Sequence, residues 1–469
     1  MPARLLSRPA KQTGMDPMMS DMLKIRGRGR RPIEQILSPF QKFAHTQTAS
    51  GILLLVCSAV AIILANSPAA AWWNSVWEAK VTIGYDGYEL SKPLLLWVND
   101  GLMALFFFVV GLEIKREALV GELSSPRQAA LPIAAAIGGM AAPALFYAFF
   151  NAGQAGAAGW GVPMATDIAF ALGVLALLGS RVPPGLKIFL AALAIVDDLG
   201  AILVIAIFYT AELSVSALAV AAGVLVMLIA ANILGVRSPL VYALFGAVLW
   251  VAFLKSGVHA TIAGVLLALT IPARTLLDDE EFVAHGQELL GLYAAASGNN
   301  QEHVREERQV AVIQALETAC EHATAPLQRL ERELHAWVAF FIMPVFALAN
   351  AGIELSGNLA AAIASPVTHG VMAGLVLGKP LGILLVSWIV VRLGWAVLPG
   401  GVTWAGIHAV GWLGGIGFTM ALFIGGLAFA GAPQLLQVAK LGVLSASALA
   451  GVVGLVLLHR ALAPAPKPA

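Results

Sequence analysis

The stretch that decides the fold covers residues 191–200, AALAIVDDLG, and places two adjacent carboxylates, Asp197 and Asp198, inside an apolar segment. This segment runs from about residue 184 to residue 209, and a helix needs about 20 residues to cross the hydrocarbon core of a bilayer. We therefore expect both aspartates near the bilayer midplane. An ionisable side chain at that depth costs about 2.5–3.5 kcal/mol on insertion, so it indicates a functional site.

The composition predicts a polytopic membrane protein with an all-α fold. Of the 469 residues, 59% are hydrophobic and 12% are charged, whereas about 25% of the residues in soluble domains are charged. The formal net charge of +1 gives no sign of nucleic-acid binding, because the charges are divided among the segments between helices. Cys57 and Cys320 make neither a disulfide framework nor a zinc site.

Hydropathy predicts twelve transmembrane helices. They cover about residues 49–66, 94–112, 129–150, 159–179, 184–209, 213–234, 239–253, 257–273, 335–353, 366–391, 402–429 and 435–459. Residues 47–273 thus hold helices 1–8 and residues 335–460 hold helices 9–12, followed by a C-terminal tail at 461–469. Residues 1–46 form a basic tail, in which Ile36, Phe40 and Phe43 predict a short helix on the membrane surface. A signal peptide is the competing interpretation, but the first apolar run starts only near residue 50.

Lysine and arginine in the short loops predict the orientation. One side carries Lys115, Arg116, Arg127, Arg181, Arg237, Arg274, Arg392 and Arg460, whereas the other carries only Lys80, Lys92, Lys255 and Lys440. Because cytoplasmic loops are the basic ones, both termini are expected in the cytoplasm of a bacterial cell, with the helices in its inner membrane.

Two connections differ from short loops. Residues 80–91 flank Asp86-Gly87 with β-branched and aromatic side chains, which predicts an extracytoplasmic β-hairpin. An isolated hairpin is marginal in water, so we expect it to pair further, with its copy in a second subunit as one candidate. Residues 274–334 are polar and Glu-rich, which favours a cytoplasmic helical insert over a ligand-sensing module. His303, Cys320 and His322 lack metal-ligand spacing.

Two more ionisable residues are expected at mid-depth, Asp167 in the fourth span and Lys379 in the tenth. Three carboxylates and one amine at one level would cost on the order of 10 kcal/mol of insertion. Pro163 and the glycines of residues 411–419, GWLGGIGFT, predict that the fourth and eleventh spans are broken at their centres. Spans 3–5 and 10–12 then form an inverted repeat with two discontinuous crossing helices. The alternative for the glycines is close helix packing.

At this point the sequence resembles the NhaA-type sodium/proton antiporters. The matching stretches are 99–107 NDGLMALFF, 111–117 GLEIKRE, 165–173 ATDIAFALG, 194–200 AIVDDLG, 255–261 KSGVHAT, 378–382 GKPLG and 414–420 GGIGFTM. They follow the family order over about residues 48–460, and as a set they are highly specific. The family is a known example of inverted-topology repeats.

The resemblance implies roles for five residues. Asp198 corresponds to the principal ligand for sodium or lithium, and Asp197 to a neighbour that either joins it or pairs with the lysine. Asp167 and Lys379 correspond to groups that offset the half-helix dipoles, and Thr166 to a supporting oxygen ligand. The alternative for Asp167 and Lys379 is that they hold the broken helices together without moving a proton.

The resemblance also implies electrogenic exchange by alternating access, without a cofactor. Carboxylates bind either a hard cation or protons, but not both well at once. Burial disfavours an ionised carboxylate and a nearby ammonium favours it. Two protons are expected to enter from the periplasm, on the aspartate pair or on Asp198 and Lys379, for each sodium that leaves. Transport would then respond to membrane potential.

Regulation by pH is a further implication, with Glu113, Lys115, Arg116 and Glu331 in the matching places of helices 2 and 9. Arg332 departs from the family pattern, because a histidine is usual there, so the resemblance does not define the pH set point. His259 lies in a matching motif and titrates in the relevant range, although a structural role at a helix start is the alternative. Asp100 is a candidate accessory acid or a helix cap.

Two other functions fit parts of the sequence. A sodium-coupled symporter of the same architecture, such as the bile-acid type, would need a roomy cavity, and the Asp-Asp pair with a mid-helix lysine suits proton exchange better. An intramembrane aspartyl protease would place its aspartates on separate helices in Tyr-Asp and Gly-x-Gly-Asp settings, neither of which occurs here. Phosphate-binding Gly-x-x-x-x-Gly-Lys loops are also absent from the sequence.

Overall fold

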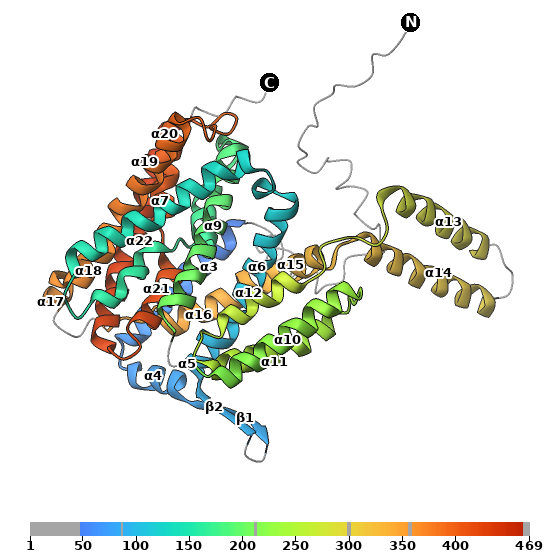
Figure 1. Cartoon of the computed structure of the whole chain (residues 1–469), viewed down its shortest axis with the longest axis horizontal. Helices are drawn as coiled ribbons and strands as arrows, with labels where there is room; N and C mark the ends of the chain where they lie inside the picture. The colour runs from blue at the N-terminus through green and yellow to red at the C-terminus, as the bar shows by residue number, and fades with distance from the viewer. Residues whose placement is uncertain (1–46, 86–87, 211–212, 298–301, 355–358, 463–469) are drawn as a thin grey trace, which may run out of the picture. The chain divides into compact units, whose positions relative to one another are not determined.

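The computed structural model describes residues 47–85, 88–210, 213–297, 302–354 and 359–462 (Figure 1). The predicted surface helix around Ile36, the Asp86-Gly87 turn and most of the C-terminal tail lie outside these ranges. Within them the chain is mostly helical, with one small sheet.

The apolar helices follow the predicted segments in order. The helices before the polar insert are α3 (Gln47–Ala65), α4 (Ala70–Glu78), α5 (Leu94–Leu96), α6 (Met103–Val120), α7 (Pro126–Asn151), α8 (Ile168–Ala176), α9 (Pro184–Phe208), α10 (Val215–Ile233), α11 (Pro239–Ser256) and α12 (Thr261–Thr270). After the insert come α15 (Pro326–Trp337), α16 (Met343–Asn350), α17 (Leu359–Ala364), α18 (Pro366–Ala373), α19 (Lys379–Arg392), α20 (Trp404–Gly414), α21 (Phe418–Ala428) and α22 (Pro433–Ala461).

Short π and 3-10 segments interrupt or join these helices. The π-helical turns are η1 (Trp97–Leu102), η5 (Val338–Ile342) and η6 (Gly374–Gly378), and the 3-10 segments are η2 (Glu122–Ser124), η3 (Ala157–Met164) and η4 (Gly179–Arg181). The segment η3 ends just before the extended residues that lead into α8.

Nine helices of the described ranges are long and apolar enough to cross a membrane, and the count rises to eleven if each bent helix pair is one span. One of these pairs is α20 with α21, bent by 45°. The predicted segment at 257–273 corresponds to α12, which has only 10 residues. The total of twelve spans therefore stays a prediction.

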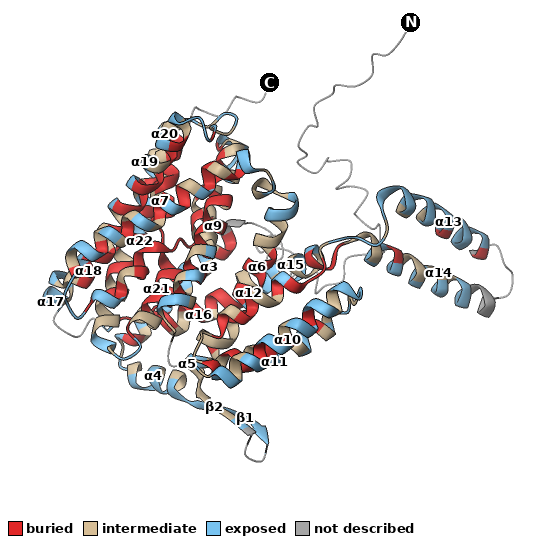
Figure 2. Ribbon diagram, in the orientation of Figure 1, coloured by how far each residue is buried: buried red, intermediate tan, exposed pale blue. Residues whose placement is uncertain are grey.

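Buried and exposed apolar residues are arranged as expected for a membrane protein. Figure 2 shows buried residues along α7, α9, α21 and α22. Large apolar side chains such as Ile207, Val226 and Leu244 are exposed on the outer helices. A soluble domain rarely exposes so many contiguous apolar side chains, whereas lipid covers them in a bilayer.

The predicted hairpin forms a two-stranded antiparallel sheet of β1 (Lys80–Tyr85) and β2 (Tyr88–Pro93). Its register pairs Lys80 with Pro93 and Tyr85 with Tyr88. Every residue of β1 is exposed, including Tyr85, so the far edge of this strand is open among the described residues.

In the polar insert, α13 (Asp279–Ser297) and α14 (Glu302–Ala323) lie side by side in Figure 1. The following helix, α15, begins at Pro326, before the predicted end of the insert at residue 334. The two ends of the α13–α14 pair meet at one point, because the backbone N–H groups of Leu276 and Leu277 donate to the carbonyl oxygen of His322. The Leu327 N–H donates to the Pro272 carbonyl and joins α15 to the end of α12.

Helices α7 and α19 make a close contact that positions the site. A Cβ atom on Gly138 would overlap the carbonyl oxygen of Gly382, and the reverse also holds. Larger side chains would separate the two backbones. The glycines therefore keep α19, which begins at Lys379, close to α7.

Candidate functional site

The aspartate pair lies in the middle of α9, as the sequence predicts. Asp197 and Asp198 are each 1% exposed. Helix α9 packs against α6, α7, α8 and α20, so both carboxylates lie within the helical core. Taking two charges out of water requires partners nearby.

The two predicted helix breaks lie against each other. The Asp167 N–H donates to the Ile416 carbonyl (2.7 Å). The Thr166 hydroxyl lies 2.9 Å from the Gly414 carbonyl oxygen and shares its one proton between this oxygen and Asp197 Oδ2. These bonds join the extended segment before α8 to the turn between α20 and α21. Breaks leave backbone groups unpaired inside the protein, and here each break supplies partners for the other.

Asp167 caps two helix starts with one carboxylate. Its Oδ1 accepts from the Phe170 N–H (3.0 Å), in the first turn of α8. Its Oδ2 accepts from the Thr419 N–H (3.2 Å) and from the Thr419 hydroxyl, at the start of α21. A negative charge is stabilised at helix N-termini, so this geometry favours the capping role for Asp167.

Lys379 joins the aspartate pair to the first break. Its Nζ donates to Asp197 Oδ2 (2.5 Å) and to the Met164 carbonyl at the end of η3. The side chain is 1% exposed. An ammonium is stabilised near carbonyl groups at a helix end.

Two oxygens of the aspartate pair are not satisfied. Asp197 Oδ2 accepts from Lys379 and from the Thr166 hydroxyl (2.7 Å). Asp197 Oδ1 and Asp198 Oδ1 are buried and accept no hydrogen bond from any described residue. A buried carboxylate oxygen without a donor is costly unless a proton or a cation neutralises it.

These oxygens are of the ligand type that a small hard cation prefers. Two carboxylates and the Thr166 hydroxyl supply only oxygen ligands, the type that hard cations prefer. In the described ranges, His, Cys, Asp and Glu side chains do not gather in threes into a metal site. A cation held by the pair would therefore use hydroxyl or carbonyl oxygens besides the two carboxylates.

The predicted regulatory residues of α6 and α15 form a second cluster. Arg116 pairs with Glu331 (Nε–O 3.4 Å) and with Glu117 (2.9 Å). Glu113 Oε1 lies 3.9 Å from Nδ1 of His335, a residue that follows Glu331 by one helical turn. A cavity of about 400 Å³ is lined by Arg116, Gln328, Glu331, Arg332 and His335. Lys115 does not join these ion pairs.

Lys115 instead caps the end of α12. Its Nζ donates to the carbonyl oxygens of Leu269 (2.7 Å) and Ile271 (2.5 Å). Lysine near a helix C-terminus stabilises the last carbonyl groups. His335, which lies beside Glu113, was not singled out from the sequence.

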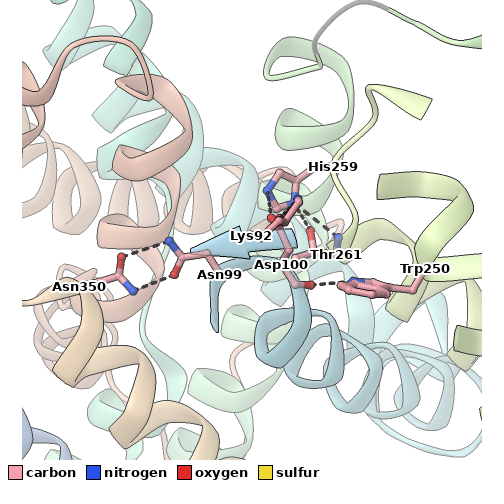
Figure 3. Close-up of polar contacts among 7 residues, drawn as sticks. All are labelled: Lys92, Asn99, Asp100, Trp250, His259, Thr261 and Asn350. Carbon is pink, nitrogen blue, oxygen red and sulfur yellow. Dashed lines mark hydrogen bonds and ion pairs between the residues drawn. The ribbon is translucent and has the colours of Figure 1, made fainter. Parts of the chain in front are cut away.

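Asp100 and His259 belong to a third cluster, separate from the second (Figure 3). Asp100 pairs with Lys92 of β2 (2.7 Å) and lies 3.7 Å from His259 Nε2. Its carbonyl oxygen accepts from the Trp250 indole (2.9 Å). Asp100 and Glu113 are thirteen positions apart on continuous helical segments, or roughly 20 Å along the axis. The structure thus separates His259 from the Glu113 cluster.

Neighbouring contacts define this third cluster further. The side-chain amides of Asn99 and Asn350 bond each other in both directions, at 3.3 and 2.8 Å (Figure 3). The hydroxyl of Thr261 lies 2.8 Å from His259 Nδ1. Asp100 lies inside the π-helical turn η1, so it is not the capping residue of a helix.

Comparison with known proteins identifies the family. The family model described as Na+/H+ antiporter 1 matches residues 41–458. A protein of Oleidesulfovibrio alaskensis named Na+/H+ antiporter NhaA is 52% identical over 435 residues, covering 93% of this chain and 96% of the relative. A protein of Syntrophotalea carbinolica named Na+/H+ antiporter NhaA 2 is 54% identical over 426 residues, covering 91% and 97%. The match spans nearly all of both proteins, and this chain therefore belongs to the Na+/H+ antiporter 1 family.

Proposed function

We propose that the protein exports sodium or lithium from the cytoplasm in exchange for protons, at the carboxylates of Asp197 and Asp198. The observation that carries the proposal is the pair of unsatisfied oxygens, Asp197 Oδ1 and Asp198 Oδ1, in a buried site beside Lys379. Its relatives bear the names of antiporters, which are transporters and not enzymes. A secondary transporter of cations fits both observations.

Competition explains the coupling. With both oxygens free of protein donors, the site holds either a cation or protons, and binding one releases the other. Asp198 is the principal ligand, because Asp197 already accepts from Lys379 and Thr166. Thr166 supplies a third oxygen next to the pair. Exchange of two protons, on the aspartate pair or on Asp198 and Lys379, for one sodium moves net charge and responds to membrane potential.

Alternating access would use the broken helices. Spans 3–5 and 10–12 are proposed to form an inverted repeat, with the breaks before α8 and between α20 and α21 at the fixed site. Rocking of these helices against the rest would open the aspartates first to one side and then to the other. The bonds from Asp167 and Thr166 to residues 414–416 support this arrangement, because they keep the two breaks together.

Location, assembly and regulation complete the proposal. The chain lies in a bacterial inner membrane with both termini in the cytoplasm. Its open β1 edge pairs with a second copy to make a homodimer. The cluster of Glu113, Arg116 and Glu331 adjusts activity to cytoplasmic pH, because protonation of its members changes the ion pairs between α6 and α15.

Inverted membrane vesicles with a pH-sensitive dye test the exchange. A respiratory substrate acidifies the vesicle interior, and sodium, lithium, potassium or a bile acid is then added. We expect sodium or lithium to restore the fluorescence, because each cation that enters drives protons out, and potassium to have little effect. Sodium-driven uptake of the bile acid without proton movement would instead establish a symporter. Proton movement that does not respond to an imposed membrane potential would contradict the electrogenic cycle.

A further inference from the structure

The start of α21 has no capping side chain of its own. Its capping position is Gly417, and a Cβ atom there would lie 3.0 Å from Leu375 Cδ2 and 3.1 Å from the Ala165 carbonyl. The Ser, Thr, Asn or Asp that usually caps a helix would fit here only if these neighbours shifted by a few tenths of an ångström. The first N–H groups of α21 must therefore find acceptors elsewhere.

Two other segments supply these acceptors. The Phe418 N–H donates to the hydroxyl of Ser447 on α22 (3.1 Å), and the Thr419 N–H donates to Asp167 Oδ2 (3.2 Å). Thr419 is fully buried and Ser447 is 6% exposed. The Thr419 hydroxyl makes a second bond to the same Asp167 oxygen. The first turn of α21 is thus held by α22 on one side and by Asp167 on the other.

This arrangement is connected to the aspartate pair through two consecutive residues. Asp167 accepts a hydrogen bond from the Thr419 hydroxyl, and the preceding residue, Thr166, donates from its own hydroxyl to Asp197 Oδ2 (2.7 Å). Residues 166 and 167 are extended between η3 and α8, and Asp167 is the capping residue at the start of α8. A shift of the Asp167 carboxylate would move the Thr166 hydroxyl as well.

We propose that Thr419 and Ser447 are positioning residues for cation binding: Ser447 fixes the first turn of α21, and Thr419 fixes Asp167, and with it the Thr166 hydroxyl at the aspartate pair. Neither residue contacts the aspartate pair in the bonds described. The inference rests on the proposed exchange function and adds to it the groups that orient the site.

Thr419→Val tests this role, because valine keeps the shape of threonine and removes only the hydroxyl. A hydrogen bond to a charged group changes an equilibrium constant by about tenfold or more. We expect the sodium concentration for half-maximal exchange in inverted vesicles to rise about tenfold, with a maximal rate within about twofold of the unsubstituted protein. Thr419→Ser keeps the hydroxyl and should restore half-saturation to within about twofold.

Ser447→Ala is the second variant. It should also raise the sodium concentration for half-maximal exchange, but by a smaller factor, because it removes only the acceptor of the Phe418 N–H. Its matched control is Ser387→Ala. Ser387 is a fully buried serine on α19 whose hydroxyl bonds no described residue, so half-saturation should not change. If Thr419→Val does not fold, as judged by size-exclusion chromatography, Ser447→Ala against Ser387→Ala decides the matter.

The outcomes are distinct. Unchanged half-saturation in Thr419→Val and Ser447→Ala, equal defects in Thr419→Val and Thr419→Ser, or a loss confined to the maximal rate would each overturn the positioning role. Absence of sodium-dependent exchange in the unsubstituted protein would overturn the proposed function, and this inference with it.

Discussion

Replacing Asp198 with asparagine is expected to reduce sodium-dependent proton exchange by at least about 100-fold. Removing the charge of a buried ionic group costs about 3–5 kcal/mol of the interaction, and each 1.4 kcal/mol is tenfold. Asp198 is 1% exposed and its Oδ1 has no donor among the described residues, so the loss of charge leaves the cation without its principal ligand. The measurement is the initial rate of sodium-dependent dequenching in inverted vesicles.

Asp278→Asn is the matched control for this substitution. Asp278 caps the start of α13 by accepting from the Glu281 N–H (2.8 Å), in the polar insert and away from α9. Its exchange rate should equal that of the unsubstituted protein at equal expression. An Asp198→Asn variant that keeps more than about a tenth of the exchange would remove Asp198 from the site.

Replacing Lys379 with methionine is expected to destabilise the protein and to abolish exchange. The substitution removes the 2.5 Å hydrogen bond from Lys379 Nζ to Asp197 Oδ2. The Asp197 carboxylate then stays buried with one remaining donor, the Thr166 hydroxyl. Breaking a buried ion pair on one side costs about 3–5 kcal/mol, because the other charge stays uncompensated. The thermal midpoint of the purified protein should therefore fall by several degrees.

A double variant separates the charge effect from packing. Lys379→Met combined with Asp197→Asn replaces the ion pair by two neutral side chains, so it should regain part of the lost stability without regaining exchange. Lys255→Met, at an exposed lysine near the end of α11, should leave the thermal midpoint unchanged. A double variant no more stable than Lys379→Met would show that packing, and not the buried charge, causes the loss.

Much of the helical framework could be predicted from the sequence, because hydropathy depends only on local composition. Each expected apolar segment coincides with helical structure, and the hairpin at 80–91 pairs around the expected turn. Pro163 and the glycines near residue 415 indicated where helices break, since those residues act on their own backbone. The breaks lie at 165–167 and 415–417 in the structure.

The partners of the site residues were harder to predict. A threonine in an apolar helix usually bonds back to its own helix, so no local pattern assigns Thr419 to Asp167. In the stretch GGIGFT the glycines indicate a helix break, whereas the threonine hydroxyl carries no signal of its distant partner. The contact between Thr419 and Asp167 joins residues 252 positions apart, and it forms only through tertiary packing. The local sequence pattern therefore cannot predict it.

Two other expectations changed for similar reasons. Asp100 fits a helix-capping position in the sequence, but the π-helical turn η1 places it inside the helix, where it pairs with Lys92. Arg332 occupies the usual histidine position, yet His335 lies close to Glu113. A helix brings residues three or four positions apart to the same face. His335, three positions after Arg332, is therefore the residue from which a histidine near Glu113 could be predicted.

Proton release on sodium binding tests the central claim most directly, that sodium and protons compete for the aspartate pair. Purified protein in weakly buffered detergent at alkaline pH is titrated with sodium chloride, and the released protons are counted with a pH dye against choline chloride. We predict release of about two protons per bound sodium in the unsubstituted protein and none in Asp198→Asn. Sodium binding without proton release, or equal release from Asp198→Asn, would contradict competition at these carboxylates.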